Sequence, residues 1–478
     1  MTSARQVALA CAGIIVIVLV TEPSARRVLG LPWPFTASWL ALAAAATLGL
    51  FVGSQPRVRL YRVTTVALGS GIVTIAAVAV YLVVRLIGHL GLGEPHPEVI
   101  GVPMVFIACT IFGRWRSRPV GPSDVLVAVA ISLFALTDLR QVGTHPLRDF
   151  DIYVRAGQNL MDGAPVYISS PLTTLPPVSE LPFLYPPLTL PMFALLALLP
   201  GPASAVLWFG ALGGATVLAL RVIGIEWRWV PILLLWPPCF TGIWSGNVAP
   251  IAFMLFALGP LSAAYLILGV TFKLHNGIPA MWAIRERRWR DVVVGVALLG
   301  VLVLASLPLV GIGAWRDWIL SLGYFQATAQ MYPTVISHAL WRFLPAAIVV
   351  ALSIAAMLIG LHRSGTPGLA RLGVASVVAS PSLYGHGLMV LVPGLLELPS
   401  TLYWFALSVA SLGIWGPWLA VICAVIALLV PAIPAARLPD DRYHPSGSVS
   451  AWARYSPSRH GSSDGRQEEQ VGHARTTS

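Results

Sequence analysis

Long apolar runs with almost no charge are the feature that most limits what this chain can fold into. The 478 residues are 57% hydrophobic and only 10% charged, whereas soluble domains carry roughly 25% charged residues. So little charge cannot cover a surface that faces water. The composition therefore excludes a soluble enzyme, a disordered protein and a nucleic-acid-binding protein, and it predicts an all-α polytopic membrane protein.

The apolar runs divide the chain into predicted membrane spans. A spanning helix needs about 20 apolar residues, and shorter runs suffice where neighbouring helices shield them, which gives about 13–16 spans here. They lie near residues 7–22, 37–53, 61–84, 99–113, 123–139, 185–200, 203–220, 230–244, 248–260, 262–283, 292–311, 337–361, 369–383, 387–397, 401–413 and 415–434.

The distribution of arginine predicts how these spans are oriented. Arginines cluster in the short loops 57–62, 114–118 and 285–290, and loops rich in Arg or Lys stay on the cytoplasmic side of a membrane. Alternating the predicted spans puts all three loops on one side, which is therefore predicted to be cytoplasmic. Arg221 and Arg228 are the exceptions, because this count places them outside.

The loop 141–184 is then predicted to lie outside, and it begins within the most charged stretch of the chain. Residues 138–162 hold four aspartates, three arginines and a histidine. Within that stretch, the apolar spacing of 151–161 predicts a short helix lying on the membrane surface.

Two carboxylates at the start of this helix, Asp149 and Asp151, are candidates for chemistry. Two readings stay open: a solvated loop whose acids offset Arg148 and Arg155, or a general base. A carboxylate partly shielded by helices and lipid can take the proton from a sugar hydroxyl while that oxygen attacks.

Several short motifs resemble, in order, those of bacterial glycosyltransferase family 87. They are Asp-Phe-Asp-Ile-Tyr at 149–153, Gly-Ala-Pro-Val-Tyr at 163–167, Phe-Leu-Tyr-Pro-Pro at 183–187, Ser-Gly-Asn at 245–247, Lys-Leu-His-Asn-Gly-Ile-Pro at 273–279 and Ser-Pro-Ser-Leu-Tyr-Gly-His at 380–386. The resemblance covers roughly residues 123–435. The family consists of membrane enzymes of the GT-C type, among them mannosyltransferases that use polyprenyl-phosphate mannose and an arabinofuranosyltransferase of actinobacterial envelopes.

The resemblance implies a GT-C-like bundle of transmembrane helices whose first outer loop is functional and carries a short interfacial helix. It implies an inverting transfer of a hexosyl residue, mannosyl in the best characterised relatives, from a polyprenyl-phosphate donor. Asp149 corresponds to the family's base by its spacing to Tyr153, with Asp151 as the alternative. The acceptor is expected to be a glycolipid or a cell-envelope glycan.

The same resemblance suggests the groups that bind the substrates. They are Arg148, Tyr153, Arg155, Tyr185, Asn247, Lys273, His275, Tyr384 and His386. His386 is the first candidate for stabilising the phosphate leaving group, and Arg148 and Arg155 are alternatives because Arg binds two phosphate oxygens at once. Lys273 has two open interpretations: it reaches the site, or it snorkels to the cytoplasmic loop. No metal and no cofactor is expected.

The predicted organisation has three parts. Residues 1–122 form an N-terminal transmembrane extension of about four spans, 123–437 form the glycosyltransferase core, and 438–478 form a disordered cytoplasmic tail. The protein is expected in a bacterial plasma membrane with its active site on the outer face, in contact with a lipid donor, an acceptor and the bilayer but with no nucleic acid.

Other function classes fit the sequence less well. A transporter or lipid flippase would distribute charged residues over several spans and repeat them in two halves, whereas the polar residues here gather in one outer loop. An O-antigen-type ligase or polymerase would place its large loop late in the chain. An arabinofuranosyltransferase of the same type stays open as an alternative to a mannosyltransferase.

Overall fold

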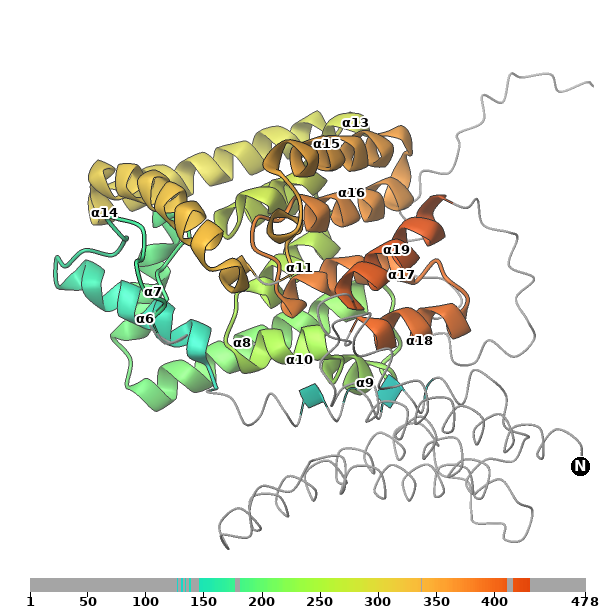
Figure 1. Cartoon of the computed structure of the whole chain (residues 1–478), viewed down its shortest axis with the longest axis horizontal. Coiled ribbons are helices and arrows are strands. Elements are labelled where there is room, and N and C mark those ends of the chain that lie inside the picture. The colour runs from blue at the N-terminus through green and yellow to red at the C-terminus, as the bar shows by residue number, and fades with distance from the viewer. Residues whose placement is uncertain are drawn as a thin grey trace, which may run out of the picture.

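The computed structural model describes six scattered residues between 127 and 138, and then 146–176, 181–336, 338–410 and 416–429. Within these ranges the chain forms α-helices and short 3-10 helices with no β-strand, so the all-α prediction is confirmed (Figure 1). The predicted extension 1–122 and the predicted tail 438–478 lie outside the described residues.

The elements follow one another in short steps. They are α6 (Arg148–Met161), η2 (Pro187–Thr189), α7 (Leu190–Ala197), α8 (Gly201–Val222), α9 (Val230–Leu234), α10 (Pro237–Trp244), α11 (Ala249–Leu258), α12 (Ala264–Leu268), η3 (Gly269–Thr271), η4 (Leu274–Ala280), α13 (Met281–Arg285), α14 (Trp289–Met331), η5 (Pro333–Ile336), η6 (Leu340–Arg342), α15 (Ala346–His362), α16 (Gly365–Ala379), η7 (Gly385–Leu391), α17 (Val392–Leu395), α18 (Ser400–Val409) and α19 (Gly416–Leu429).

Among the described helices, α8 and α14 are long and apolar enough to cross a membrane. Large apolar side chains point outward from both, for example Val206 on α8 and Leu304 on α14, which are 73% and 66% exposed. A helix that is apolar on all sides and still exposed is placed in lipid rather than in water. These helices are what the composition predicts for a membrane protein.

Helix α14 bends sharply at Gly311, which has φ 75° and ψ 158°. The part before the bend is about 30 Å long at 1.5 Å per residue. The part after it runs on to Met331 as a second helical segment. The predicted spans 292–311 and 337–361 leave the residues between them as a loop on the outer side; this prediction is wrong, because the bend redirects the helix instead of ending it.

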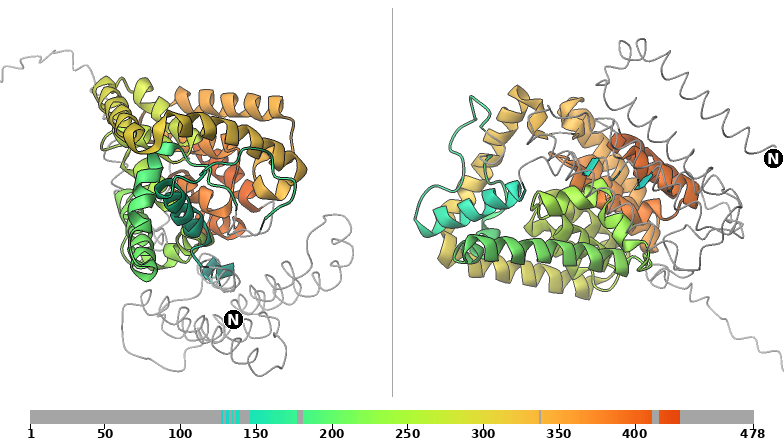
Figure 2. Two further views of the ribbon diagram at one scale, coloured as in Figure 1. Left: turned by 90° about the vertical axis from the view of Figure 1, so that its left-hand side faces the viewer. Right: turned by 90° about the horizontal axis from the view of Figure 1, so that it is seen from below.

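Helices α6 and α7 lie together at one end of the bundle (Figures 1 and 2). They approach closely because Gly157 has no side chain: a Cβ there would lie 2.5 Å from the Phe193 backbone. Helix α7 has only eight residues, about 12 Å, which is too short to cross a bilayer. The predicted span 185–200 is therefore no membrane-crossing helix: it contains η2 and the short α7, which packs against α6.

The predicted span 262–283 does not cross the bundle either. Its start and the residues after its end meet, because Arg288 donates to the carbonyl oxygens of Pro260 and Leu261 and Asp291 accepts from Ala263 N–H. Between these points α12, η3, η4 and α13 form a re-entrant hairpin. The helical backbone is interrupted at Lys273, which has an extended conformation with φ −147° and ψ 133°.

These two corrections also change the position of Arg221 and Arg228. Helix α8 starts at the α6 end, where the Trp208 indole donates to the Gly246 carbonyl at 2.8 Å, and it carries Arg221 to the far end. The arginines of 285–290 begin α14, which then runs toward the α6 end, where Trp318 donates to the Leu184 carbonyl at 3.0 Å. Both arginine groups therefore lie at the end away from α6.

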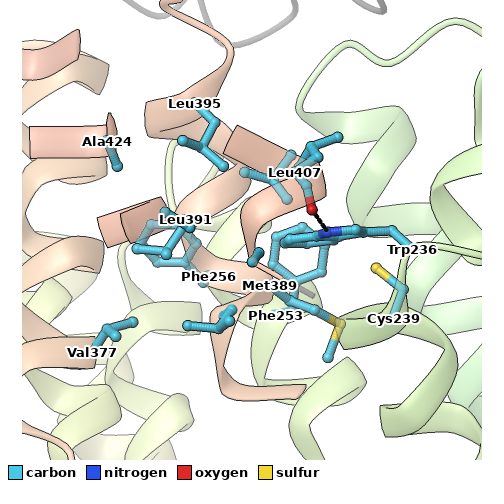
Figure 3. Close-up of a cluster of buried hydrophobic side chains, with 14 of the residues drawn as sticks. Trp236, Cys239, Phe253, Phe256, Val377, Met389, Leu391, Leu395, Leu407 and Ala424 are labelled. Atoms are coloured by element: carbon cyan, nitrogen blue, oxygen red, sulfur yellow. Dashed lines mark hydrogen bonds between the residues drawn. The ribbon is translucent and has the colours of Figure 1, made fainter. Parts of the chain in front are cut away.

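A buried hydrophobic cluster holds the bundle together between its two ends (Figure 3). Trp236 lies within it, at the break that splits the predicted span 230–244 into α9 and α10. Its indole N–H donates to the Leu407 carbonyl at 3.1 Å, so the large ring is buried without an unpaired donor. This contact ties the middle of the chain to α18.

Candidate active site

A cavity of about 730 Å³ opens at the α6 end of the molecule. It is bounded by the start of α6, the tip of the re-entrant hairpin, the second part of α14 and the turn after α16. Its polar and charged lining residues are Arg148, Asp149, Tyr153, Tyr185, Asn247, Lys273, His275, Gln326, Thr334, Ser382, Tyr384 and His386. The volume is within the range of small-molecule sites, about 300–1,000 Å³.

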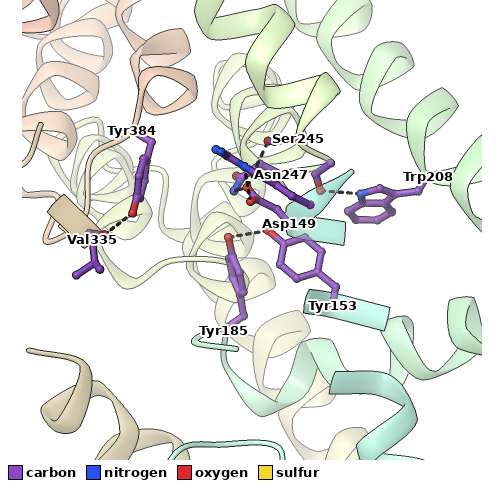
Figure 4. A network of polar contacts seen from close by, with 10 residues as sticks. Asp149, Tyr153, Tyr185, Trp208, Ser245, Asn247, Val335 and Tyr384 are labelled. Atoms are coloured by element: carbon purple, nitrogen blue, oxygen red, sulfur yellow. Dashed lines mark hydrogen bonds and ion pairs between the residues drawn. The ribbon is translucent and has the colours of Figure 1, made fainter. Parts of the chain in front are cut away.

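Asp149 is held by side chains almost 100 residues away in the sequence (Figure 4). Its Oδ2 accepts a hydrogen bond from Asn247 Nδ2 at 2.7 Å and a longer one from Ser245 Oγ at 3.3 Å. Arg148 Nε lies 3.3 Å from Asp149 Oδ1, and the Asp149 side chain is 14% exposed. Oδ1 accepts no hydrogen bond from the described residues and is the oxygen available to a ligand.

The turn that carries these partners is also fixed to the start of α6. The backbone N–H groups of Leu147 and Asp149 donate to the carbonyl oxygens of Trp244 and Ser245, both at 2.8 Å. Gly246 has φ 74°, and a Cβ at this position would lie 2.7 Å from the Phe150 Cβ. Only glycine allows both the backbone conformation and this close approach.

Asn247 has its orientation set from the other side. Its Oδ1 accepts the Ala249 backbone N–H at 2.9 Å, which caps the start of α11 in the manner of an Asx turn. With Oδ1 used in this way, the amide nitrogen must face Asp149. One asparagine thereby joins helix capping to the placement of the carboxylate.

Two tyrosines lie beside Asp149 and line the cavity. Tyr153 Oη donates to Tyr185 Oη at 2.9 Å, and the rings meet edge to face with centroids 5.2 Å apart. Burial, helped by the neighbouring Asp149 charge, raises the pKa of both phenols above the ordinary value of about 10. Both groups are therefore neutral hydroxyls that can donate hydrogen bonds at physiological pH.

Basic groups and imidazoles face the carboxylate across the cavity. Lys273 and His275 come from the tip of the re-entrant hairpin, and the Lys273 charge interacts with that of Asp149. His386 is 2% exposed, and neither ring nitrogen has a hydrogen-bond partner in the part of the chain that the structure describes. It stacks on Tyr384, with ring centroids 5.8 Å apart, and the Tyr384 hydroxyl donates to the Val335 carbonyl.

The cavity can therefore bring one carboxylate together with two cations, Arg148 and Lys273, and with the buried His386 imidazole, which has no partner among the described residues. That combination suits an anionic ligand whose reaction needs a proton acceptor. Among the described residues, no group of three or more His, Cys, Asp or Glu side chains could hold a metal ion.

Part of the chain matches a known family of enzymes. Residues 183–381 match the model of glycosyltransferase family 87. The chain carries a family 87 glycosyltransferase region. It is a glycosyltransferase, and its composition and helices make it a membrane protein. No curated protein and no solved structure matches the chain significantly.

The family 87 region contains only part of the cavity lining. Tyr185, Asn247, Lys273 and His275 fall inside it, whereas Asp149 precedes it and the pair Tyr384 and His386 follows it. The fold brings these parts to one cavity.

Two of the predicted site residues do not line this cavity. Asp151 is exposed, because two residues along a helix turn a side chain by about 200°, away from Asp149. Arg155 donates to the Leu181 carbonyl at 3.2 Å and does not reach the cavity wall. The other predicted residues are all among the lining residues.

Sequence reasoning did not select several residues that build the site. Ser245 and Gly246 were part of a quoted motif, and its central glycine was the available signal, because glycine tolerates the positive φ that this turn requires. Trp208, Trp341 and Gln326 gave no signal, because a tryptophan or glutamine in an apolar run has the same appearance whether it faces lipid, core or cavity.

Proposed function

We propose that the protein moves a hexosyl residue, namely mannosyl, from a polyprenyl-phosphate donor to a glycolipid or cell-envelope glycan, with inversion at the anomeric carbon. Asp149 acts as the general base. The observation that carries this proposal is the carboxylate clamped by Ser245 and Asn247 in a cavity that also holds Lys273.

The proposed reaction is a single displacement. Asp149 Oδ1 accepts the proton of the acceptor hydroxyl while that oxygen forms a bond to C1 of the donor sugar. The bond from C1 to the phosphate oxygen breaks, and polyprenyl phosphate leaves with the electron pair. We call the Ser245 and Asn247 side chains the clamp. Because they hydrogen-bond to Oδ2, they orient Oδ1 toward the cavity and limit the motion of the base.

The leaving group is a phosphate, and the cavity offers it charge and donors. The groups suited to the phosphate oxygens are Arg148, Lys273, the Tyr185 hydroxyl and the ring N–H of His386. Burial and the Asp149 charge raise the pKa of Tyr384 to about 12, so this phenol also stays neutral. Arg155 is no longer a candidate for phosphate binding.

The arginines at the far end favour the predicted orientation. With Arg221, Arg228 and the 285–290 group at one end, the positive-inside rule makes that end cytoplasmic and the cavity end external. A polyprenyl chain then lies in the outer half of a bacterial plasma membrane. We propose that 1–122 is a transmembrane extension and that 438–478 is a cytoplasmic tail.

In the test, purified protein in lipid nanodiscs is incubated with one labelled donor at a time. The three donors are polyprenyl-phosphate mannose, polyprenyl-phosphate arabinofuranose and a nucleotide mannose. We expect mannose transfer from the first, with the product anomer opposite to that of the donor by NMR. Transfer only from the second would identify the arabinofuranosyl alternative. Transfer from the nucleotide donor, or retained configuration, would contradict the mechanism, and failure with all donors would favour a transporter.

A further inference from the structure

The cavity has a second wall that the proposed base and phosphate groups do not use. It is formed by the part of α14 after Gly311, by η6, and by a segment that we call the strap (residues 171–176 and 181–184). Trp318, Leu322, Phe325 and Gln326 lie on one face of the helix and line the cavity. The strap adds mainly leucine and proline side chains.

Hydrogen bonds fix the strap to α14. Leu172 N–H donates to Thr328 Oγ1 at 3.0 Å, Tyr332 Oη donates to the Thr173 carbonyl at 2.7 Å, and Trp318 Nε1 donates to the Leu184 carbonyl. Three contacts along one helix make the strap and α14 a single wall. The Trp318 ring faces the cavity with its indole N–H already used.

Two polar groups on this wall have no protein partner among the described residues. The Trp341 indole N–H is buried without a hydrogen bond. The Gln326 amide, with two donors and one acceptor, also makes no hydrogen bond or ion pair there. Buried donors are normally paired, so the unpaired Trp341 indole indicates a ligand that supplies the acceptor, and the half-buried Gln326 amide lines the same cavity and can bind that ligand.

The chemistry of the wall indicates what that ligand is. None of its side chains that line the cavity is charged, so it does not suit a phosphate, and the cations of the cavity belong to the opposite wall. A lipid chain offers no partner for an amide or an indole N–H. A saccharide offers both an apolar ring face for aromatic side chains and hydroxyl groups for the two polar groups.

We infer that this wall binds the saccharide of the acceptor, and that Gln326 and Trp341 select it by hydrogen bonds to its hydroxyl groups. The inference rests on the proposed function and adds the class of acceptor: a sugar-bearing molecule whose attacking hydroxyl reaches Asp149 from this wall. The donor sugar and phosphate occupy the wall of Arg148 and Lys273.

The test compares Gln326→Leu and Trp341→Phe with wild type in nanodiscs, using polyprenyl-phosphate mannose as donor and butyl α-mannoside as a soluble acceptor. Gln326→Leu removes the amide and keeps a side chain of similar size, and Trp341→Phe removes the indole N–H and keeps an aromatic ring. We expect the acceptor KM to rise about five- to tenfold while the donor KM changes less than twofold. Gln330→Leu, one turn further along α14 and exposed, is the control and leaves both values unchanged.

A rise in the donor KM with an unchanged acceptor KM would overturn the inference, and so would variants that match Gln330→Leu. If wild type transfers nothing, the proposed function fails, and the wall is tested directly by calorimetric titration with butyl α-mannoside. Weaker binding to Gln326→Leu than to Gln330→Leu would then support a saccharide wall, and equal binding would overturn it.

Discussion

On the wall formed by α6 and the 245–247 turn, two hydrogen bonds and an ion pair hold the Asp149 carboxylate in place. On the wall formed by the second part of α14, polar groups are few, and Gln326 and Trp341 lack partners among the described residues. The first arrangement fixes one oxygen atom, as a reacting group requires. The second leaves hydrogen-bonding capacity for a ligand, as a recognition surface requires.

The largest expected effect separates the two aspartates of α6. Asp149→Asn should lower the transfer rate about 10²–10⁴-fold, because an amide cannot accept the proton. Asp151→Asn should stay within about twofold of wild type, since Asp151 is exposed away from the cavity. Rates from labelled donor measure both. Equal losses in the two variants would contradict the difference in role.

The fit between the 245–247 turn and α6 is tested with two glycines of positive φ. Gly246→Ala should cost about 3 kcal/mol of stability, because backbone strain adds to a clash with Phe150. Gly163→Ala is the matched control: its φ is 65° but no atom lies within 4 Å of the added Cβ, so only strain of about 1 kcal/mol is expected. Thermal unfolding in nanodiscs measures the difference, which vanishes if the turn does not pack against α6.

The two residues that hydrogen-bond to Asp149, Asn247 and Ser245, should contribute unequally to the transfer rate. Asn247→Ala removes a 2.7 Å bond to a carboxylate and a helix cap, which predicts a loss of about 1.5–3 kcal/mol in transition-state stabilisation. Ser245→Ala removes only the 3.3 Å contact and should cost less than about 1 kcal/mol. The ratio of kcat/KM values reports both. A larger effect from Ser245 would reverse the proposed order.

The smallest effect concerns the strap on the opposite wall. Thr328→Val keeps the side-chain volume but leaves the Leu172 N–H without its acceptor, so we expect the acceptor KM to rise about fivefold. Ser321→Ala provides the control, because Ser321 is also buried on α14 and donates only to the Trp318 carbonyl. If the two variants have the same acceptor KM, the strap does not shape the acceptor wall.

The sequence predicted those parts of the fold that depend on local patterns. The helix predicted at 151–161 is present as Arg148–Met161, and Gly201–Val222 lies close to its predicted span. Hydropathy could not show that 262–283 returns to the end where it starts. A re-entrant hairpin and a spanning helix are equally apolar, and only tertiary contacts such as Arg288 with Pro260 distinguish them.

The candidate site was predictable to a similar extent. Asp149 and Asp151 stood out because charge is scarce, but the choice between them depends on which side of α6 meets the 245–247 turn. That contact joins residues almost 100 positions apart, and no local pattern reports it. The α14 wall was missed because the charges of Arg316 and Asp317 suggest a loop, whereas they lie on the exposed side of a helix.

The most direct test of the central claim is a cryo-electron microscopy structure of the protein in nanodiscs with the product polyprenyl phosphate. The account predicts phosphate density in the cavity, within hydrogen-bond reach of Lys273 or Arg148 and on the opposite side from the α14 wall. Phosphate bound instead among the arginines of 285–290, at the far end of the bundle, would contradict it.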